Sequence, residues 1–331
     1  MAKLRVLSKD DIASLLSFEK SIEVVGDAFT AYQEGKTLIP PVVHMEIGKW
    51  RGELDIKSSY VEPTELVGAK IAGGYFDNPK NFGLPTGMGV IILLDARNGM
   101  PLAIMEGWHI TVIRTGASGA LGIKYLARQN VRVGAVIGAG NIGRIQLRGL
   151  KHFRDVEEVR VFDIDKEAAS KFVKEMSQAL EVKIISVDGA QQAVEGADVV
   201  ITCVPSREPV VMREWIAPGT HLNAIGADMK GKQELDEELF RNAKVVVDNI
   251  KQAPYWGECQ IAVSKGILKI EDIYAEIGEL TSGRKKGRMN PEEITIYDAT
   301  GVSIQDIATA GLVYRVAEER NIGQVVEIGT T

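Results

Sequence analysis

Residues 131–149 read VRVGAVIGAGNIGRIQLRG, and this stretch decides the fold. Gly138, Gly140 and Gly143 form the spacing GxGxxG, directly after an apolar strand pattern and at the start of a helical one. The first glycine permits a tight turn, the second lets a pyrophosphate approach the backbone, and the third lets helix and strand pack closely. The helix N-terminus adds unpaired N–H groups and a positive dipole. The stretch therefore predicts a dinucleotide site in a Rossmann-type domain.

The next strand pattern, VRVFD, ends at Asp163. An acidic residue at the end of the second strand accepts hydrogen bonds from both ribose hydroxyls and repels a 2′-phosphate. Asp163 therefore predicts NAD(H) rather than NADP(H) as the cofactor. A structural glycine turn, or a site for another adenosyl ligand, is the alternative interpretation.

From Val131 onward, strand patterns alternate with turns and polar helical patterns. The strand segments are apolar on both faces, which is typical of a parallel sheet covered by helices. They read VRVGAVI, EVRVFD, VKIISV, DVVITCV, HLNAIG, AKVVVD and EITIYD. Residues 202–206 and 221–226 include the ends of two segments, where such a sheet binds its dinucleotide. We expect their backbones beside the nicotinamide, although an ordinary buried strand end fits the pattern equally well.

The first third of the chain has a different pattern. Residues 8–34 predict a helical pair, in which Ser8 and Asp11 resemble an N-terminal cap and Gly35 ends the run. Residues 40–107 form short extended segments separated by Gly, Pro and Asn, which predicts a mainly antiparallel sheet. Residues 111–129 return to helical spacing, with small residues on one side, and predict a connector helix.

A last helix is predicted over residues 303–319, and we expect it to pack back on the N-terminal part. The predicted fold class is therefore α/β, with a Rossmann-type NAD-binding domain plus a discontinuous α+β domain for substrate binding and dimerisation. The domain boundaries that follow are 1–115 with 304–331 for the discontinuous domain, and 116–303 for the NAD-binding domain.

The composition indicates a folded globular protein of about two domains, with 331 residues, 45% of them apolar. The 39 basic and 45 acidic side chains give no broad positive field for nucleic acid or an anionic membrane. The start, MAKLRVLSKDD, has no apolar run of signal-peptide length, so we expect a cytoplasmic protein. Cys203 and Cys259 lack metal-ligand spacing, which favours two free thiols, with Cys203 inside a buried strand, and no metal.

Several charged residues are candidates for chemistry. Asp228 follows a strand in IGADMKGKQEL, where a carboxylate can hold an ammonium group or transfer a proton; a turn aspartate is the alternative. Lys57, Lys70 and Arg114 are placed to bind a substrate carboxylate, or else are surface charges. His109 and His221 lack a neighbouring nucleophile, so we interpret them as packing or hydrogen-bonding residues.

Motifs along nearly the whole chain resemble the ornithine cyclodeaminase/mu-crystallin family, which also contains an archaeal type of alanine dehydrogenase and several imine reductases. The motifs read GLPTGMGVIILLDARNGMPLAIMEG, IRTGASGALGIKYLAR, VIGAGNIGRIQ, NAIGADMKGKQEL, AVSKGIL and ITIYDATGVSIQD. The family implies a homodimer joined through the sheets of the N-terminal domain, with substrate held between that domain and the NAD domain.

The resemblance also implies residue roles. Asp228 matches the family's catalytic aspartate, and Lys70 matches a carboxylate-binding position that we also count as catalytic. Arg114 matches a position that binds the substrate carboxylate or lies beside the nicotinamide, and Thr300 matches a substrate-side position, while Lys57 is a further candidate for binding the substrate. The cofactor positions implied by the family and by the glycine turn are Thr86, Arg114, Thr115, Gly138, Gly140, Asn141, Ile142, Gly143, Asp163, Thr202, Val204, Leu222, Asn223, Ala224, Ile225, Lys232 and Ala299.

The chain also departs from its relatives. Val42 stands where the cyclodeaminase has an arginine and the alanine dehydrogenase type a lysine, so a carboxylate-binding charge is missing. Asp55 stands where those relatives have a glutamate or an arginine. PVVHMEIG, followed by Lys57, is more similar to the branch that contains iminosuccinate reductase. We hypothesise that Lys57 replaces the missing charge, which counts against ornithine and pyruvate as substrates.

The expected function is that of an NAD(H)-dependent oxidoreductase, of the alanine dehydrogenase or imine reductase type, interconverting an L-amino acid and its imine or 2-oxo acid. The first alternative is an ornithine cyclodeaminase-type lyase that uses NAD catalytically. The second is a nucleotide-bound ligand carrier like mu-crystallin, against which Asp228 argues because the crystallin branch lacks that acid. The expected partners are a small-molecule amino acid, 2-oxo acid or imine and a second copy of the chain, with no nucleic acid and no membrane.

Overall fold

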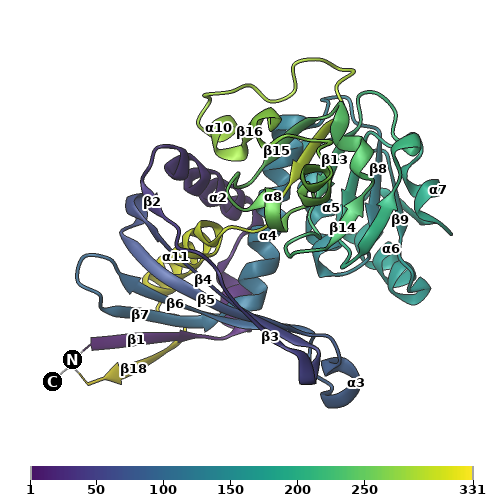
Figure 1. Cartoon of the computed structure of the whole chain (residues 1–331). Helices are drawn as coiled ribbons and strands as arrows, with labels where there is room; N and C mark the ends of the chain where they lie inside the picture. The colour runs from purple at the N-terminus through teal and green to yellow at the C-terminus, as the bar shows by residue number, and fades with distance from the viewer. Residues whose placement is uncertain (1, 330–331) are drawn as a thin grey trace. The chain divides into compact units, whose positions relative to one another are not determined.

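The computed structural model describes residues 2–329 and divides the chain into two compact units (Figure 1). Unit 1 comprises Met1–Arg114 with Val302–Thr331, and unit 2 comprises Thr115–Gly301. Residues 1, 330 and 331, which the sequence assigned to the first domain, lie outside the described residues. The domain boundaries expected from the sequence, 1–115 with 304–331 and 116–303, stay a prediction.

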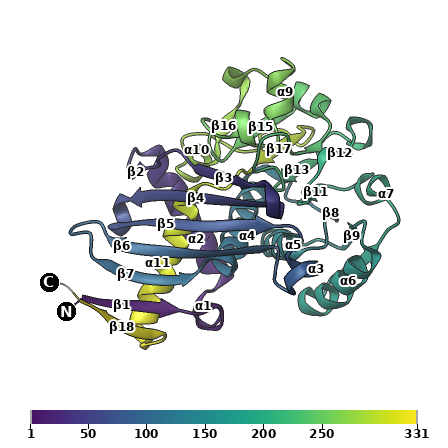
Figure 2. The ribbon, with the colours of Figure 1, turned by 60° about the horizontal axis from the view of Figure 1, so that its bottom comes forward.

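Unit 1 is built on a mixed sheet (Figure 2). Its strands follow the order β18-β1-β7-β6-β5-β4-β2, and β3 also pairs with β4. The strand bounds are β1 (Ala2–Leu7), β2 (Thr37–Leu38), β3 (Val43–Ile47), β4 (Gly52–Val61), β5 (Leu66–Tyr75), β6 (Gly87–Asp95), β7 (Pro101–Glu106) and β18 (Gln324–Ile328). All pairs are antiparallel except β1 with β7, so the predicted antiparallel sheet is confirmed. The edge strand β18 and its neighbour β1 were not predicted.

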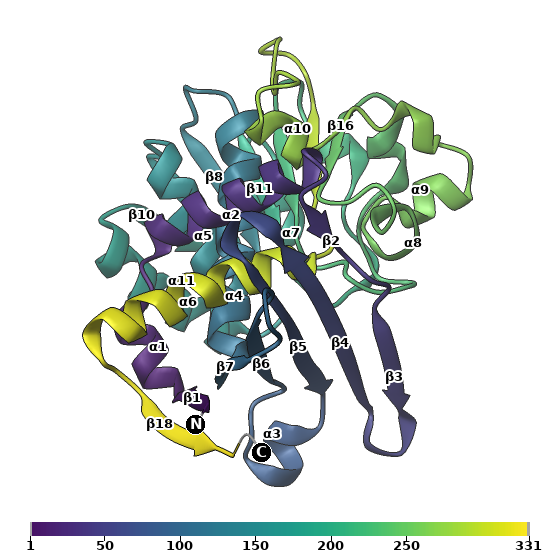
Figure 3. The same ribbon diagram turned by 90° about the vertical axis from the view of Figure 1, so that its left-hand side faces the viewer.

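Helices cover one face of this sheet. They are α1 (Lys9–Leu15), α2 (Phe18–Gln33), the first part of α4 (Gly107–Leu126) and α11 (Ser303–Arg320), while α3 (Asn78–Phe82) lies in the connection between β5 and β6. Ser8 and Asp11 form a reciprocal capping box at the start of α1, as predicted. Helix α11 packs on α2 and lies across β4 and β5 (Figure 3), which confirms the predicted return of the last helix. The C-terminal segment therefore completes the core of unit 1.

Unit 2 contains a parallel sheet in the order β10-β9-β8-β11-β13-β17-β15-β16. Its strand bounds are β8 (Val133–Ile137), β9 (Glu158–Phe162), β10 (Lys183–Ser186), β11 (Val199–Thr202), β13 (His221–Ala224), β15 (Lys244–Val247), β16 (Ala275–Glu276) and β17 (Thr295–Asp298). The order reverses beside β8, as in a Rossmann sheet, which binds ligands at the carboxyl ends of its strands. The predicted strands are confirmed.

The other elements of unit 2 are short apart from two helices. They are α5 (Asn141–Phe153), α6 (Lys166–Leu180), α7 (Ala190–Val194), α8 (Ala253–Trp256), α9 (Gln260–Ser264), α10 (Ile277–Thr281), and β12 (Arg207–Val211) paired with β14 (Gln233–Leu235). Single 3-10 turns cover Gly48–Trp50, Glu62–Thr64, Arg213–Trp215, Glu237–Arg241 and Ile270–Asp272.

In the part of the chain described, no helix is both long enough and apolar enough to cross a membrane.

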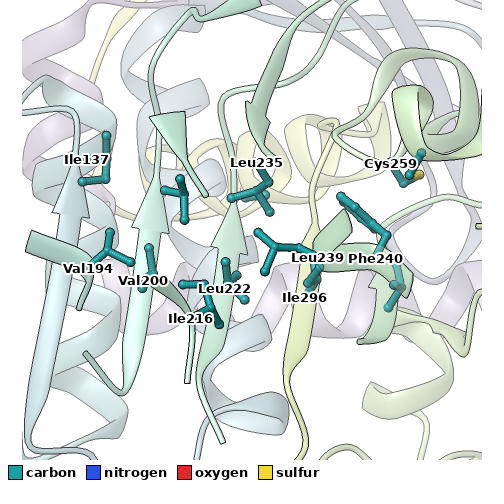
Figure 4. Close-up of a cluster of buried hydrophobic side chains, with 14 of the residues drawn as sticks. Ile137, Val194, Val200, Ile216, Leu222, Leu235, Leu239, Phe240, Cys259 and Ile296 are labelled. Atoms are coloured by element: carbon teal, nitrogen blue, oxygen red, sulfur yellow. The ribbon is translucent and has the colours of Figure 1, made fainter. Parts of the chain in front are cut away.

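Both faces of the unit 2 sheet are buried in apolar cores. On one face, neighbouring strands contribute side chains that are at most 2% exposed (Figure 4), namely Ile137, Val200, Leu222 and Ile296. The next residue back along β8, Val136, belongs to the core on the opposite face. Alternate residues of each strand thus enter different cores, which explains why these segments are apolar throughout.

The connector helix differs from its predicted range of 111–129, because side chains outside the helix satisfy backbone groups at both of its ends. Glu106 accepts hydrogen bonds from the N–H groups of Trp108 and His109, at 2.8 Å each, so α4 begins at Gly107. At the other end, the guanidinium of Arg154 donates to the carbonyls of Ile123 and Ala127, at 2.9 Å each. A buried cation therefore satisfies the last carbonyls of the helix.

Cys203 requires a correction. It lies one residue beyond the end of β11 and is partly exposed, whereas the sequence placed it inside a buried strand. Its thiol faces the carbonyls of Ile137 and Gly138 at 3.4 Å. Its N–H still donates to the carbonyl of Ile137 at 3.0 Å, but Ile137 is the last residue of β8, so Cys203 lies where the ladder between the two strands ends. Cys259 is buried, and both cysteines are free thiols.

Candidate active site

The glycine turn joins β8 to α5 with each glycine in a distinct environment. Gly138 has φ +111°, a backbone conformation that L side chains rarely adopt. A Cβ on Gly143 would overlap the carbonyl of Gly138, so helix and strand approach too closely for any side chain. A Cβ on Gly140 would meet nothing within 4 Å. As the N-cap of α5, Gly140 also offers no side chain to cap the first N–H groups. The turn thus leaves room and backbone donors for an anion.

Asp163 follows β9 and faces this turn. Its Oδ2 accepts the N–H of Ala139 at 2.8 Å, and its Oδ1 accepts the N–H of Asp165 at 2.9 Å. The carboxylate is therefore held beside the glycine turn, as expected for an acid that binds an adenosine ribose. Asn141 and Ile142, which the family resemblance assigns to the cofactor, form the first turn of α5. These groups fit a dinucleotide.

The predicted residues at the ends of β11, β13 and β17 share the carboxyl edge of the sheet. They are Thr202, Val204, Leu222, Asn223, Ala224, Ile225 and Ala299. Leu222 lies in the apolar core, and the Asn223 amide donates to the Gly119 carbonyl at 3.3 Å and to Oε1 of Gln146 at 3.1 Å. The side chains of Leu222 and Asn223 are therefore engaged inside unit 2, and their backbone is paired with β11 on one side and β17 on the other.

Asp228 lies in the loop that follows β13. Its Oδ1 accepts a hydrogen bond from Nζ of Lys232 at 2.6 Å, and its side chain is 51% exposed while that of Lys232 is 13% exposed. Asp228 is thus an accessible carboxylate at the carboxyl edge of the sheet with a cation beside it.

Unit 1 buries a group of charged side chains, which we call the cation cluster: Lys57, Lys70, Arg114 and Asp306. Nζ of Lys70 lies 2.9 Å from Oδ1 of Asp306 and 2.8 Å from its Oδ2. Nε of Arg114 donates to the same Oδ1 at 2.9 Å. Lys57 lies directly opposite Lys70 in the β4–β5 ladder. Each of the four residues is at most 6% exposed.

The cation cluster strongly perturbs its ionisable groups. Burial, together with repulsion from Arg114 and Lys57, lowers the pKa of Lys70 to about 7 although Asp306 opposes this. Burial alone would raise the pKa of Asp306, but Arg114 and Lys70 hold it below the usual value. The carboxylate therefore stays charged, and Lys70 titrates near neutral pH.

Sequence reasoning did not single out Asp306. It ends the motif ITIYDATGVSIQD, and this is the signal that could have found it. The neighbouring Gln305 shares its role, because its Oε1 accepts a hydrogen bond from Nη1 of Arg114 at 3.0 Å. Helix α11 therefore supplies polar groups to the cation cluster from the C-terminal end of the chain.

Val42 and Asp55, two positions at which this chain departs from its relatives, lie in or directly before the strands near Lys57. His44 and Asp55 face each other across the β3–β4 ladder, with Nδ1 and Oδ1 2.7 Å apart. Alternation along β4 places Asp55 on the same face as Lys57. Val42 precedes β3 and supplies no charge. Polar groups on this face are thus Lys57, Asp55 and His44.

The structure assigns each of the remaining predicted site residues to one of the two units. Thr86 and Arg114 belong to unit 1, and Thr115 belongs to unit 2 on the same helix α4. Thr300 is 2% exposed; its Oγ1 donates to Asp248 at 2.8 Å. The Thr300 hydroxyl also accepts a hydrogen bond from Gln252 at 2.9 Å, so it is engaged within unit 2.

The histidines fit the packing interpretation. His221 is fully buried, and its Nδ1 lies 2.9 Å from Oγ1 of Thr295. Burial lowers the pKa of His221 to about 3, so its ring is neutral at physiological pH. Burial also lowers the pKa of His109. Neither ring is arranged beside a Ser or Cys nucleophile in the contacts described.

Sequence reasoning also missed a second buried group, the carboxyl chain: Glu234, Glu258 and Asp298. All three are at most 1% exposed, and burial raises the pKa of each above its usual value. Glu234 is the last residue but one of the motif NAIGADMKGKQEL, and Asp298 is the last residue of the strand pattern EITIYD. Both had been treated only as parts of longer motifs.

Comparisons with known proteins give a consistent result. The model of the ornithine cyclodeaminase/mu-crystallin family matches residues 3–321. A solved archaeal structure, described as an alanine dehydrogenase dimer with bound NAD, is 40% identical to this chain. The two superpose with a TM-score of 0.94, covering 99% of this chain and 100% of that one.

Two further solved structures are similarly close. Delta(1)-pyrroline-2-carboxylate reductase of Thermococcus litoralis, in complex with NADH and L-proline, is 37% identical with a TM-score of 0.93, covering 97% of this chain and 99% of that one. The iminosuccinate reductase of Paracoccus denitrificans, in complex with NAD+, is 30% identical with a TM-score of 0.92, covering 98% and 100%. Both units of this chain therefore have counterparts in each of these structures.

Proposed function

Because the chain belongs to the ornithine cyclodeaminase/mu-crystallin family, we propose that it is an NAD(H)-dependent oxidoreductase that interconverts an L-amino acid and its imine or 2-oxo acid. The observation that carries the proposal is the cation cluster of unit 1. Three basic side chains surround one carboxylate, so these four groups are net positive when the lysines are protonated. Such a site suits a carboxylate substrate.

Unit 2 supports the cofactor half of the proposal. The glycine turn and the start of α5 would hold the pyrophosphate, and Asp163 would bind the ribose and disfavour a 2′-phosphate. When bound, the nicotinamide supplies or accepts the hydride at the carbon that bears nitrogen. The close relatives with NAD, NADH or NAD+ in their solved structures support the same cofactor.

The residues then divide the work on the substrate. Lys70, Arg114 and Lys57 bind the substrate carboxylate and so orient the reacting carbon. Asp228 binds the amine cation and transfers a proton at nitrogen, which its exposed carboxylate and the adjacent Lys232 support. The chain has no basic residue at Val42 but has one at Lys57, which is close to Val42 in the sequence. We therefore assign Lys57 as the residue that supplies the missing charge.

The open face of the unit 1 sheet supports a homodimer. The paired strands β3, β4, β5 and β6 present apolar side chains on this face. Four of these side chains are each at least 40% exposed, namely Val43, Met45, Met88 and Val90. A hollow of about 310 Å³ between them is lined by residues of β4, β5 and β6. A continuous exposed apolar patch of this kind is typical of a protein interface. The archaeal alanine dehydrogenase structure is itself a dimer.

The first experiment follows NADH absorbance with ammonia or methylamine and a panel of carbonyl and imine acids: pyruvate, oxaloacetate, glyoxylate and pyrroline-2-carboxylate. A parallel arm tests for proline and ammonia from ornithine and NAD. NADH consumption with one acid is the expected result and identifies the substrate class. Proline and ammonia without net NADH change would instead establish the cyclodeaminase. NADH binding with no turnover in either arm would favour a ligand carrier.

A cytoplasmic location remains part of the proposal.

A further inference from the structure

The carboxyl group of Glu234 joins the ends of two neighbouring strands in unit 2. Its Oε1 accepts the N–H of Val204 at 2.6 Å. Its Oε2 accepts the hydroxyl of Thr202 and the N–H of Gly226, both at 2.8 Å. Thr202 ends β11, and Gly226 lies two residues after β13. One fully buried side chain therefore ties together the carboxyl edge at which this sheet would meet its cofactor.

The same side chain closes the loop that carries Asp228. The loop leaves β13 at Gly226 and reaches Glu234 in β14, and Glu234 holds the N–H of Gly226, so both loop ends meet at one carboxyl group. A Cβ on Gly226 would lie 2.5 Å from Oε1 of Glu234, so this approach requires glycine. Asp228 is two residues from the anchored end and Lys232 two from the other. The position of Asp228 therefore depends on Glu234.

Glu234 is itself anchored by the rest of the carboxyl chain. Oε1 of Glu258 accepts the N–H groups of Glu234 and Leu235, at 2.8 and 2.7 Å. Asp298, the last residue of β17, accepts the N–H groups of Glu258 and Cys259, at 2.9 Å each. In each link, a carboxyl group accepts the N–H of the residue that bears the next carboxyl. The chain thus connects the Asp228 loop to the centre of the sheet.

We propose that Glu234 is the positioning residue for Asp228 and for the backbone amides at the ends of β11 and β13. The proposal rests on the proposed function, in which Asp228 binds the amine and transfers a proton. A carboxylate suits this position because it accepts only, and it faces three donors. Glutamine in its place would turn an N–H toward another donor. The oxygens of the carboxyl chain accept N–H groups of the loop and the strand ends, so the chain acts as a brace. Within residues 2–329, no group of acidic, His or Cys side chains has the arrangement of a metal site.

The titration of Glu234 gives the proposal a specific signature. Burial raises the pKa of Glu234 to about 7, while its three hydrogen bonds and the charge of Lys232 oppose the rise. The other titratable groups near it are Glu258, Asp298 and the Cys203 thiol, and burial raises the pKa of each of these. When Glu234 takes up a proton, one oxygen becomes a donor and the N–H groups lose an acceptor. We therefore expect the Asp228 loop to loosen below about pH 7.

The test compares Glu234→Gln with Glu238→Gln, a matched change at an exposed glutamate that pairs with Arg241. In Glu234→Gln we expect kcat to fall about 100-fold, the scale of effect that a small misplacement of a catalytic group produces. The KM for NADH should stay close to the wild-type value. The acid limb of the wild-type kcat profile near pH 7 should disappear. Hydrogen exchange should speed up in peptides covering residues 203–206 and 226–232, and Glu238→Gln should match the wild type in all four measurements.

Unchanged kcat and unchanged exchange in folded Glu234→Gln would overturn the proposal. If that variant does not fold, Thr202→Val removes one of the three donors, and faster exchange confined to residues 226–232 is then expected; wild-type exchange there would overturn the proposal equally. Wild-type inactivity toward every substrate of the panel would count against the proposed function alone. The exchange comparison would still decide whether Glu234 positions the loop.

Discussion

The two units bury ionisable side chains in opposite ways. In unit 1, the carboxylate of Asp306 is paired with the cations Lys70 and Arg114. In unit 2, Glu234, Glu258 and Asp298 are all acidic and are held mainly by backbone N–H groups. The pKa of Asp306 is consequently held below its usual value, whereas burial raises the pKa of both Glu234 and Asp298 to about 7.

This difference separates two uses of buried charge. Paired side-chain charges keep the cation cluster ionised, which is what the recognition of an anionic substrate requires. Carboxyl groups held by backbone amides fix segments of chain in place without presenting a strong charge. Unit 1 is thus organised for binding, while the carboxyl chain of unit 2 is organised for positioning. Four predictions test this comparison.

The largest effect is expected from Asp306→Asn. The change leaves buried Lys70 and Arg114 without their carboxylate, and breaking a buried ion pair in this way costs about 3–5 kcal/mol. Urea denaturation should show this loss in the free energy of unfolding. Asp10→Asn, at an exposed position in α1, is the control and should change it by no more than about 0.5 kcal/mol. Equal changes in the free energy of unfolding of the two variants would mean that the ion pairs of Asp306 do not stabilise unit 1.

The next effect concerns Asp228, the exposed acid that the carboxyl chain of unit 2 positions. Asp228→Asn should lower kcat by at least about 100-fold, because proton transfer by a placed side chain contributes on this scale. NADH binding, measured by fluorescence, should remain at the wild-type level. Asp188→Asn, whose side chain is 90% exposed in the wild type, serves as a control. Unchanged turnover in Asp228→Asn would remove its assigned role.

The two units should also differ in how their stability depends on pH. The folded-state pKa of Asp298, about 7, exceeds its unfolded value of 3.8, so the stability it contributes is lost as pH rises from about 4 to 7. The folded-state pKa of Lys70, about 7, lies below its unfolded value of 10.5. The unfolded state therefore binds more protons between these values, and stability rises with pH from about 7 to 10.5.

Each group contributes a slope of at most about 1.4 kcal/mol per pH unit. Chemical denaturation over these pH ranges checks both signs, with Asp298→Asn and Lys70→Met as the variants that remove them. The difference between the wild type and Asp298→Asn should fall as pH rises through the lower window. The difference between the wild type and Lys70→Met should rise through the upper window. Slopes of the same sign in the two windows would contradict the comparison.

The smallest effect is expected at Asp163, an acid of unit 2 outside the carboxyl chain. Asp163→Ser removes the charge that repels a 2′-phosphate, so the ratio of kcat/KM for NADPH to that for NADH should rise about tenfold, equivalent to about 1.4 kcal/mol. Steady-state kinetics with both cofactors measures the ratio. Asp188→Ser should leave it unchanged. A ratio that does not move in Asp163→Ser would count against Asp163 as the ribose-binding acid.

Local patterns in the sequence predicted most of the fold. The strands of unit 2, the opening helical pair and the glycine turn were all predicted, because periodicity and backbone needs are written in neighbouring residues. The terminal strands β1 and β18 were missed, and the ends of α4 were displaced. In α4 the reason is that Glu106 and Arg154 set those ends, and the contacts of Arg154 come from another helix.

The candidate site divides in the same way between sequence and structure. The sequence by itself determined the residue types of the site: the glycine spacing, Asp163, Asp228 and the basic residues. Only the tertiary structure decided their partners. Asp306 lies 236 positions from Lys70 along the chain, and the carboxyl chain reaches from Glu234 to a strand more than 60 positions away. Which buried charges meet is fixed by the packing of distant elements, because desolvation penalises any arrangement that leaves them unpaired.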